Sequence, residues 1–196
     1  MTPYDFVANN PAVIAEANKK GITPLVQETD YTLISTRKEL KQTTTLLAIT
    51  TTNNRELLEA PIDAATNLGA SNKQDFLHHR RSDLDQVAAK LLKQKNAALI
   101  LNLQQLKQTK NPGRVLGRIQ QNARIAKKLG VNVILASFAQ TPEELHTIHD
   151  QEAKWKALDI SEELVTQNQE TIQELLKQAK HRRSDAYIAE GITKKE

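Results

Sequence analysis

Short apolar runs alternate along the chain with longer segments of helical periodicity, and this alternation restricts the possible folds more than any other feature. Several of the runs are apolar throughout, as in strands that are covered on both faces. Strands separated by helices build βαβ units, which assemble into a parallel sheet. The sequence therefore predicts an α/β fold, either a (β/α) barrel or an open doubly wound sheet. The predicted strands are 22–26, 45–50, 62–65, 97–101 and 131–136, with a weaker one at 31–35.

Helix start and stop signals flank the segments between these strands. Residues 82–85, Ser-Asp-Leu-Asp, have the form of a capping box that precedes an apolar stripe. Pro112 opens a second helix, which Gly130 ends. Residues 141–144, Thr-Pro-Glu-Glu, form another capping box with proline at the first helical position. We expect Ser161 to cap a last long helix that reaches about residue 180.

Length and composition predict one cytoplasmic domain. A chain of 196 residues can bury a substantial core as a single unit, 1–196, with a short basic extension over about 180–196. The absence of cysteine excludes disulfides, thiolate zinc sites and thiol chemistry, and it suits a reducing cytosol. No apolar stretch approaches the roughly 18 residues of a membrane span, so we expect a soluble protein.

Charge is segregated along the chain. Residues 86–142 contain no Asp or Glu but ten Lys and Arg, whereas 143–175 are mainly acidic and 180–183 are basic again. Lys and Arg commonly decorate exposed helix faces, but an ordinary surface mixes both signs. The basic stretch therefore favours a nucleic-acid-binding face over a merely solvated one.

Motifs for nucleotide binding or acyl transfer are missing. The six glycines form neither G-x-G-x-x-G nor G-x-x-x-x-G-K, and there is no G-x-S-x-G elbow. His146, His149 and Asp150 could form part of a metal site, although solvated helix residues explain the same pattern. A catalytic metal needs about three convergent ligands, so the solvated alternative is favoured.

Five blocks of sequence, in order, resemble archaeal ribonuclease P (RNase P) protein component 3 and its eukaryotic counterpart. One block is 79–91, HRRSDLDQVAAKL, where a basic pair leads through an acidic turn into a helix, followed by a strand at 96–99. The other blocks are Asn54-Arg55 with Ile62-Asp63, then 101–106, then 124–139, and finally 181–192.

This resemblance implies a fold and a role. The family has a TIM-like barrel related to the metal-dependent PHP phosphoesterases, here with fewer than eight strands in so short a chain. Membership implies a non-catalytic subunit that supports removal of the 5′ leader from precursor tRNA. The expected partners are the RNase P RNA, which carries the catalytic site and its Mg²⁺, and a Pop-type protein subunit in a heterotetramer. Precursor tRNA is contacted indirectly, and no membrane is involved.

Departures from the family pattern refine this expectation. Residues 4–8, YDFVA, occupy the place where PHP enzymes carry an H-x-H metal motif, so we expect no metal site, cofactor or catalytic residue in this chain. Residues 104–105 and 146–150 lack the family's arginines, and we assign no RNA contact there. The alternatives are a PHP-type phosphoesterase that uses His146, His149 and Asp150, or a barrel that binds another structured RNA.

The candidate RNA contacts are cations of the basic segments. Arginine is favoured because its planar fork can hold a phosphate bidentately. Lys110, Arg114 and Arg118 recur every four residues and are expected to project from one side of a helix. The predicted RNA-binding residues are Arg80, Arg81, Arg114, Arg118, Arg124, Lys127, Lys128, Arg182 and Arg183.

Overall fold

A five-stranded parallel sheet forms the centre of the molecule. The computed structural model describes residues 2–51, 54–69, 74–75, 77–78, 80–184, 187–189 and 192–193. The α/β class predicted from the sequence is confirmed, and the six predicted strands form at the expected places, five of them in this sheet. In spatial order its strands are β3 (Tyr31–Ile34), β4 (Leu47–Thr50), β5 (Ala64–Thr66), β6 (Ala98–Asn102) and β7 (Val133–Ala136).

Two further parallel strands, β1 (Tyr4–Val7) and β2 (Thr23–Val26), pair with each other. This second sheet meets the first at single bridges on both sides, Val7 with Ala139 and Gln27 with Tyr31. The seven parallel strands thus follow one another in chain order in a barrel-like arrangement. In the described residues the hydrogen-bonded ladder is not continuous at either junction, so no closed barrel forms.

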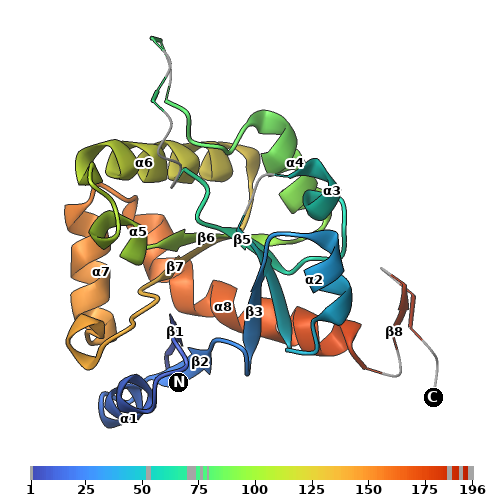
Figure 1. The fold of residues 1–196 in the computed structure, drawn as a ribbon, viewed down its shortest axis with the longest axis horizontal. Helices are drawn as coiled ribbons and strands as arrows, with labels where there is room; N and C mark the ends of the chain where they lie inside the picture. The colour runs from blue at the N-terminus through green and yellow to red at the C-terminus, as the bar shows by residue number, and fades with distance from the viewer. Residues whose placement is uncertain are drawn as a thin grey trace.

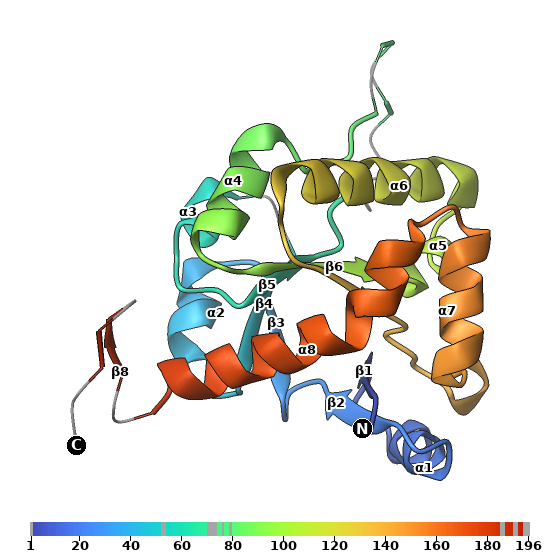
Figure 2. The same cartoon turned by 180° about the vertical axis from the view of Figure 1, so that it is seen from behind.

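The long helix α8 (Glu162–Arg182) explains why the barrel stays open between β7 and β1. The Asn168 amide accepts from the Leu135 N–H at 2.7 Å and donates to the Leu135 carbonyl at 2.9 Å. The Gln169 amide does the same with Tyr4 of β1, at 2.7 and 3.0 Å. Two helix side chains therefore satisfy backbone groups of β7 and β1 that would otherwise bond to a neighbouring strand. Figure 2 shows α8 lying across the strands.

Apolar side chains cover both faces of the central sheet. On the outer face, strand residues pack against α3 (Arg55–Leu58), α4 (Gln86–Gln94) and α6 (Pro112–Leu129) (Figure 1). On the inner face they pack against the apolar side of α8 and against the rings of Phe6, Tyr31 and Phe138. Burial on both faces explains why the strands read as continuous apolar runs.

The helix signals were partly right. α6 begins at Pro112 and ends at Gly130, whose φ of +68° suits glycine, as predicted. Ser82 does not cap α4. The left-handed backbone of Asp83, at φ +59°, prevents the helix from starting at Ser82, and the Asp85 carboxylate caps it by accepting from the Ala88 N–H.

The remaining elements complete the described chain. The capping box at Thr141 forms, but it begins a single 3₁₀ turn, Pro142–Glu144, rather than an α-helix. None of the described helices combines the length and the apolar character needed to cross a membrane. The other elements are α1 (Pro11–Lys19), α2 (Arg37–Gln42), α5 (Gln104–Lys107), α7 (Ile148–Ala157), β8 (Tyr187–Ala189) and β9 (Ile192–Thr193).

Candidate nucleic-acid interface

The segment that precedes α4 is fastened to the polar side of α6. Asn122 is buried and donates to two backbone carbonyls, of Leu68 at 3.0 Å and of Ser82 at 3.1 Å. Gln121 donates to the Ser82 hydroxyl at 3.0 Å and to the Arg80 carbonyl at 3.3 Å. These amides hold the basic pair of the 79–91 block against the helix. His79 of that block lies outside the described residues.

A glycine in α6 makes room for Arg80. Gly117 is buried, and a Cβ at this position would overlap the Arg80 guanidinium. The side chain of Arg80 therefore lies directly against the helix while the residue remains exposed. Arg114, half-buried, stands one turn away on the same side of α6. The fold thus brings together two predicted RNA-binding arginines that lie 34 residues apart in the sequence.

Arg118 does not project from the surface as predicted. Its side chain is 0% exposed, and both Nε (2.8 Å) and Nη2 (2.7 Å) contact Oδ1 of Asp75. Nη1 donates to the Gly69 carbonyl at 2.9 Å. Arg118 is a buried anchor that joins α6 to the preceding loop, so it is withdrawn from the candidate RNA contacts. Lys110 precedes α6, so the expected stripe does not form.

Asp75 carries the negative charge that compensates this anchor. Burial opposes ionisation of the carboxyl, but the Arg81 backbone N–H and the Arg118 guanidinium hydrogen-bond to it, and the charges of Arg118 and Arg114 add to their effect. Together they lower the pKa of Asp75. Gly69, Asp75 and the Arg81 backbone are thereby tied to α6, beside the exposed Arg80 and the half-buried Arg114.

The carboxyl-terminal half of α6 adds further cations. Arg124 and Lys128 are exposed and lie one turn apart. Lys127 is also exposed, and its ammonium pairs with Glu163 at 2.5 Å. Because both partners are about half exposed, this ion pair is weak and can exchange for a phosphate.

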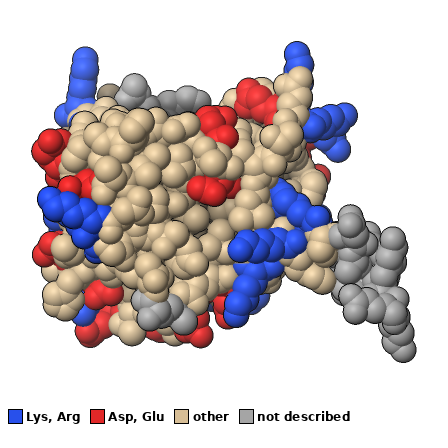
Figure 3. All heavy atoms as spheres, turned by 90° about the horizontal axis from the view of Figure 1, so that it is seen from below, with Lys and Arg blue, Asp and Glu red and all other residues tan. Residues whose placement is uncertain are grey.

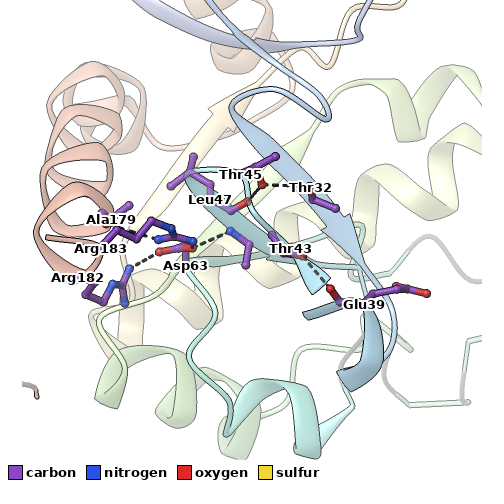
Figure 4. A network of polar contacts seen from close by, with 10 residues as sticks. Thr32, Glu39, Thr43, Thr45, Leu47, Asp63, Ala179, Arg182 and Arg183 are labelled. Carbon is purple, nitrogen blue, oxygen red and sulfur yellow. Dashed lines mark hydrogen bonds and ion pairs between the residues drawn. The ribbon is translucent and has the colours of Figure 1, made fainter. Parts of the chain in front are cut away.

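Arg182 and Arg183 form a separate group at the end of α8. Both guanidiniums approach the buried carboxylate of Asp63 (Figure 4). Nη2 of Arg182 contacts Oδ1 of Asp63, and Nη2 of Arg183 lies 3.5 Å from Oδ2. The same carboxylate accepts the Ala48 N–H at 2.7 Å. These two arginines therefore anchor α8 beside β5. Since α6 covers the outer face of the sheet and α8 the inner face, the predicted cations lie on two surfaces.

The histidines of the alternative metal site do not form a ligand cluster. The His149 side chain is 98% exposed and faces Glu152 at 3.9 Å. Burial, together with the charges of Lys154 and Lys107, lowers the pKa of His146. Within the described residues, no group of three or more His, Asp or Glu is placed to hold a metal ion.

Comparison with known proteins supports the fold. No protein-family model matches the chain. No curated protein sequence matches it either. Among solved structures, the chain is similar to one in the cryo-EM structure of archaeal Ribonuclease P with mature tRNA. The TM-score is 0.66 at 16% identity, over 96% of this chain and 86% of the other.

A second solved structure is less similar. The crystal structure of an uncharacterized protein aligns at a TM-score of 0.46 and 12% identity, over 71% of this chain and 36% of the other. At 16% identity the first likeness shows the fold alone, an α/β protein with a parallel sheet.

Proposed function

We propose that this chain is a protein subunit of RNase P that binds the catalytic RNA and supports removal of the 5′ leader from precursor tRNA. The observation that carries the proposal is the likeness, over 96% of the chain, to a chain of an archaeal RNase P structure. It agrees with the five sequence blocks, which resemble protein component 3 in the correct order. The finer assignment, a TIM-like barrel of the PHP type from an archaeal RNase P, belongs to this proposal.

In this role the protein supplies cations and shape while the RNA supplies the cleavage site and its Mg²⁺. Exposed arginines and lysines on a rigid scaffold neutralise phosphates and fix the position of RNA helices without reading their sequence. The α6 surface contributes Arg80, Arg81, Arg114, Arg124, Lys127 and Lys128, and the end of α8 contributes Arg182 and Arg183. The proposed protein partner is a Pop-type subunit, in a heterotetramer located in the cytoplasm.

Reconstitution tests this function. Archaeal RNase P RNA and its other protein subunits would be assembled with and without this chain, and cleavage of precursor tRNA would be measured over a range of Mg²⁺ concentrations. We expect the chain to raise the cleavage rate or to lower the Mg²⁺ requirement, because added cations reduce repulsion between RNA helices. An unchanged rate and an unchanged Mg²⁺ requirement would contradict the assignment.

Substitution of Gly117 by alanine separates RNA binding from folding. Alanine is favoured over glycine inside a helix by roughly 0.8–1 kcal/mol, but its Cβ would displace the Arg80 guanidinium. We therefore expect Gly117→Ala to weaken RNA affinity in a filter-binding assay while thermal stability stays unchanged or rises.

The matched control is Gly113→Ala on the same helix, where an added Cβ meets nothing within 4 Å. This variant should bind RNA as the wild type does. Equal affinity of the two variants would show that the position of Arg80 against α6 is irrelevant to binding.

A further inference from the structure

A cationic groove lies between α2 and the segment that precedes β5. It has a volume of about 360 Å³, within the range of small-molecule sites. Figure 3 shows basic side chains gathered near the end of α8, on the right of the view. Three cations and a threonine line the groove together with an apolar floor: Arg37, Lys41, Arg183 and Thr43, with Leu40, Ala48, Ala60 and Pro61.

The cations of this groove are arranged for an anion. The Arg183 guanidinium is held by two hydrogen bonds of 3.5 Å, which it donates to the buried Asp63 carboxylate and to the Ala179 carbonyl (Figure 4). Arg37 pairs with Glu56 at 3.2 Å, but both side chains are more than half exposed, so the pair is easily exchanged. Lys41 is exposed and forms no ion pair with a described residue.

The lining combines charge with an apolar surface, and this combination selects the ligand. Among the described residues, no carboxylate lines the groove. A phosphate would satisfy the cations, and a base would cover the apolar floor and stack on a guanidinium plane. An acidic peptide side chain would use the cations but leave the floor exposed to water.

We propose that this groove binds one nucleotide of a single-stranded RNA segment, with its phosphate on Lys41, Arg37 and Arg183 and its base on the apolar floor. The inference deepens the proposed function, because it gives the chain a second RNA contact, lined by α2, the segment before β5 and the end of α8 and by no described residue of α6. It also gives a role to the contact of Arg183 with Asp63, because the carboxylate orders this arginine before RNA arrives and so lowers the entropic cost of binding.

Binding of a short fluorescein-labelled oligouridylate to the full chain tests the groove. Lys41→Ala should weaken binding about fivefold at roughly 0.1 M salt and reduce the slope of log K against log salt by about 0.7, as expected for one lost phosphate contact. The matched control is Lys38→Ala, on the same helix and exposed but outside the groove lining, which should change neither value. Circular dichroism would verify that both variants are folded.

Equal losses in the two variants would contradict the groove, because they would indicate general attraction to a basic surface. Displacement of the oligouridylate by a poly-glutamate peptide of equal charge, at equal or lower concentration, would assign the groove to a protein partner and overturn the proposal. The assay needs no RNase P RNA. If the chain has no effect in reconstitution but Lys41→Ala weakens oligouridylate binding, the proposed function is contradicted and the groove is supported. If the chain acts in reconstitution but Lys41→Ala binds oligouridylate as the wild type does, the groove is contradicted and the proposed function is supported.

Discussion

Replacement of Arg118 by alanine is expected to destabilise the fold by about 3–5 kcal/mol, measured by urea unfolding. The side chain is fully buried, and its removal would leave a cavity between α6, Gly69 and Asp75. It would also leave the Gly69 carbonyl and the Asp75 carboxylate without the guanidinium that binds them. Each of these losses acts in the same direction.

Two further variants separate the causes. Arg124→Ala removes an exposed arginine from the same helix and should change stability by no more than about 0.5 kcal/mol. Arg118→Met keeps most of the packing volume but loses the ion pair with Asp75 and the hydrogen bond to the Gly69 carbonyl, so it should fall between the other two. If Arg118→Ala unfolds at the same urea concentration as Arg124→Ala, the anchor has no role in stability.

The same residue shows where sequence reasoning about the site reached its limit. A spacing of four places Arg114 and Arg118 on one side of the helix, but Arg114 is half-buried there whereas Arg118 is covered by the rest of the protein. The local sequence pattern does not show that Asp75, 43 residues earlier, forms an ion pair with Arg118. Three residues of the candidate set do lie near one another: Arg80 packs on Gly117, the Arg81 backbone N–H binds Asp75, and the charge of Arg114 acts on the same carboxyl.

The fold was predictable as far as local patterns determine it. Apolar runs and caps located six strands and the α6 and α8 helices, because burial on both faces and helix termini leave marks in sequence. β1 was missed, since Tyr4–Val7 includes a buried charged residue, Asp5, that interrupts the apolar run.

The partial closure of the barrel depends on long-range contacts. The amides of Asn168 and Gln169 contact strands 33 and 165 residues away, and no local pattern distinguishes them from solvated helix residues. A signal does exist in retrospect: both are polar residues next to the apolar stripe of a long helix. Only the three-dimensional arrangement shows which backbone groups they satisfy.

Asp5 is the buried carboxyl with the largest expected effect of pH. Desolvation raises its pKa to about 6, even though hydrogen bonds from Ser137, Gln151 and Phe6 favour the charged form. Its Oδ1 accepts the Ser137 and Phe6 N–H groups at 2.9 Å, and its Oδ2 accepts the Ser137 hydroxyl at 2.5 Å and Gln151 at 2.9 Å. The carboxyl thus ties β1 to the end of β7 and to α7.

The sign of the pH effect follows from the direction of this shift. A carboxyl whose pKa is higher in the folded than in the unfolded state gives a stability contribution that is full below the unfolded value, 3.8, and lost as the pH rises through about 6. A shift of this size corresponds to about 3 kcal/mol. Relative to Asp5→Asn, the wild type should therefore lose most of this, about 2 kcal/mol of unfolding free energy, between about pH 4 and pH 7, measured by urea titration at each pH.

Asp150 provides the control because its pKa moves the other way. Its carboxylate accepts from the Thr147 hydroxyl, which lowers the pKa, so the wild type should gain stability relative to Asp150→Asn as the pH rises. The test uses the difference in unfolding free energy between wild type and variant. Loss of a hydrogen bond changes this difference equally at every pH, whereas ionisation makes it depend on pH. A flat Asp5→Asn difference across this pH range would mean that Asp5 is not desolvated and that the junction of β1, β7 and α7 admits water.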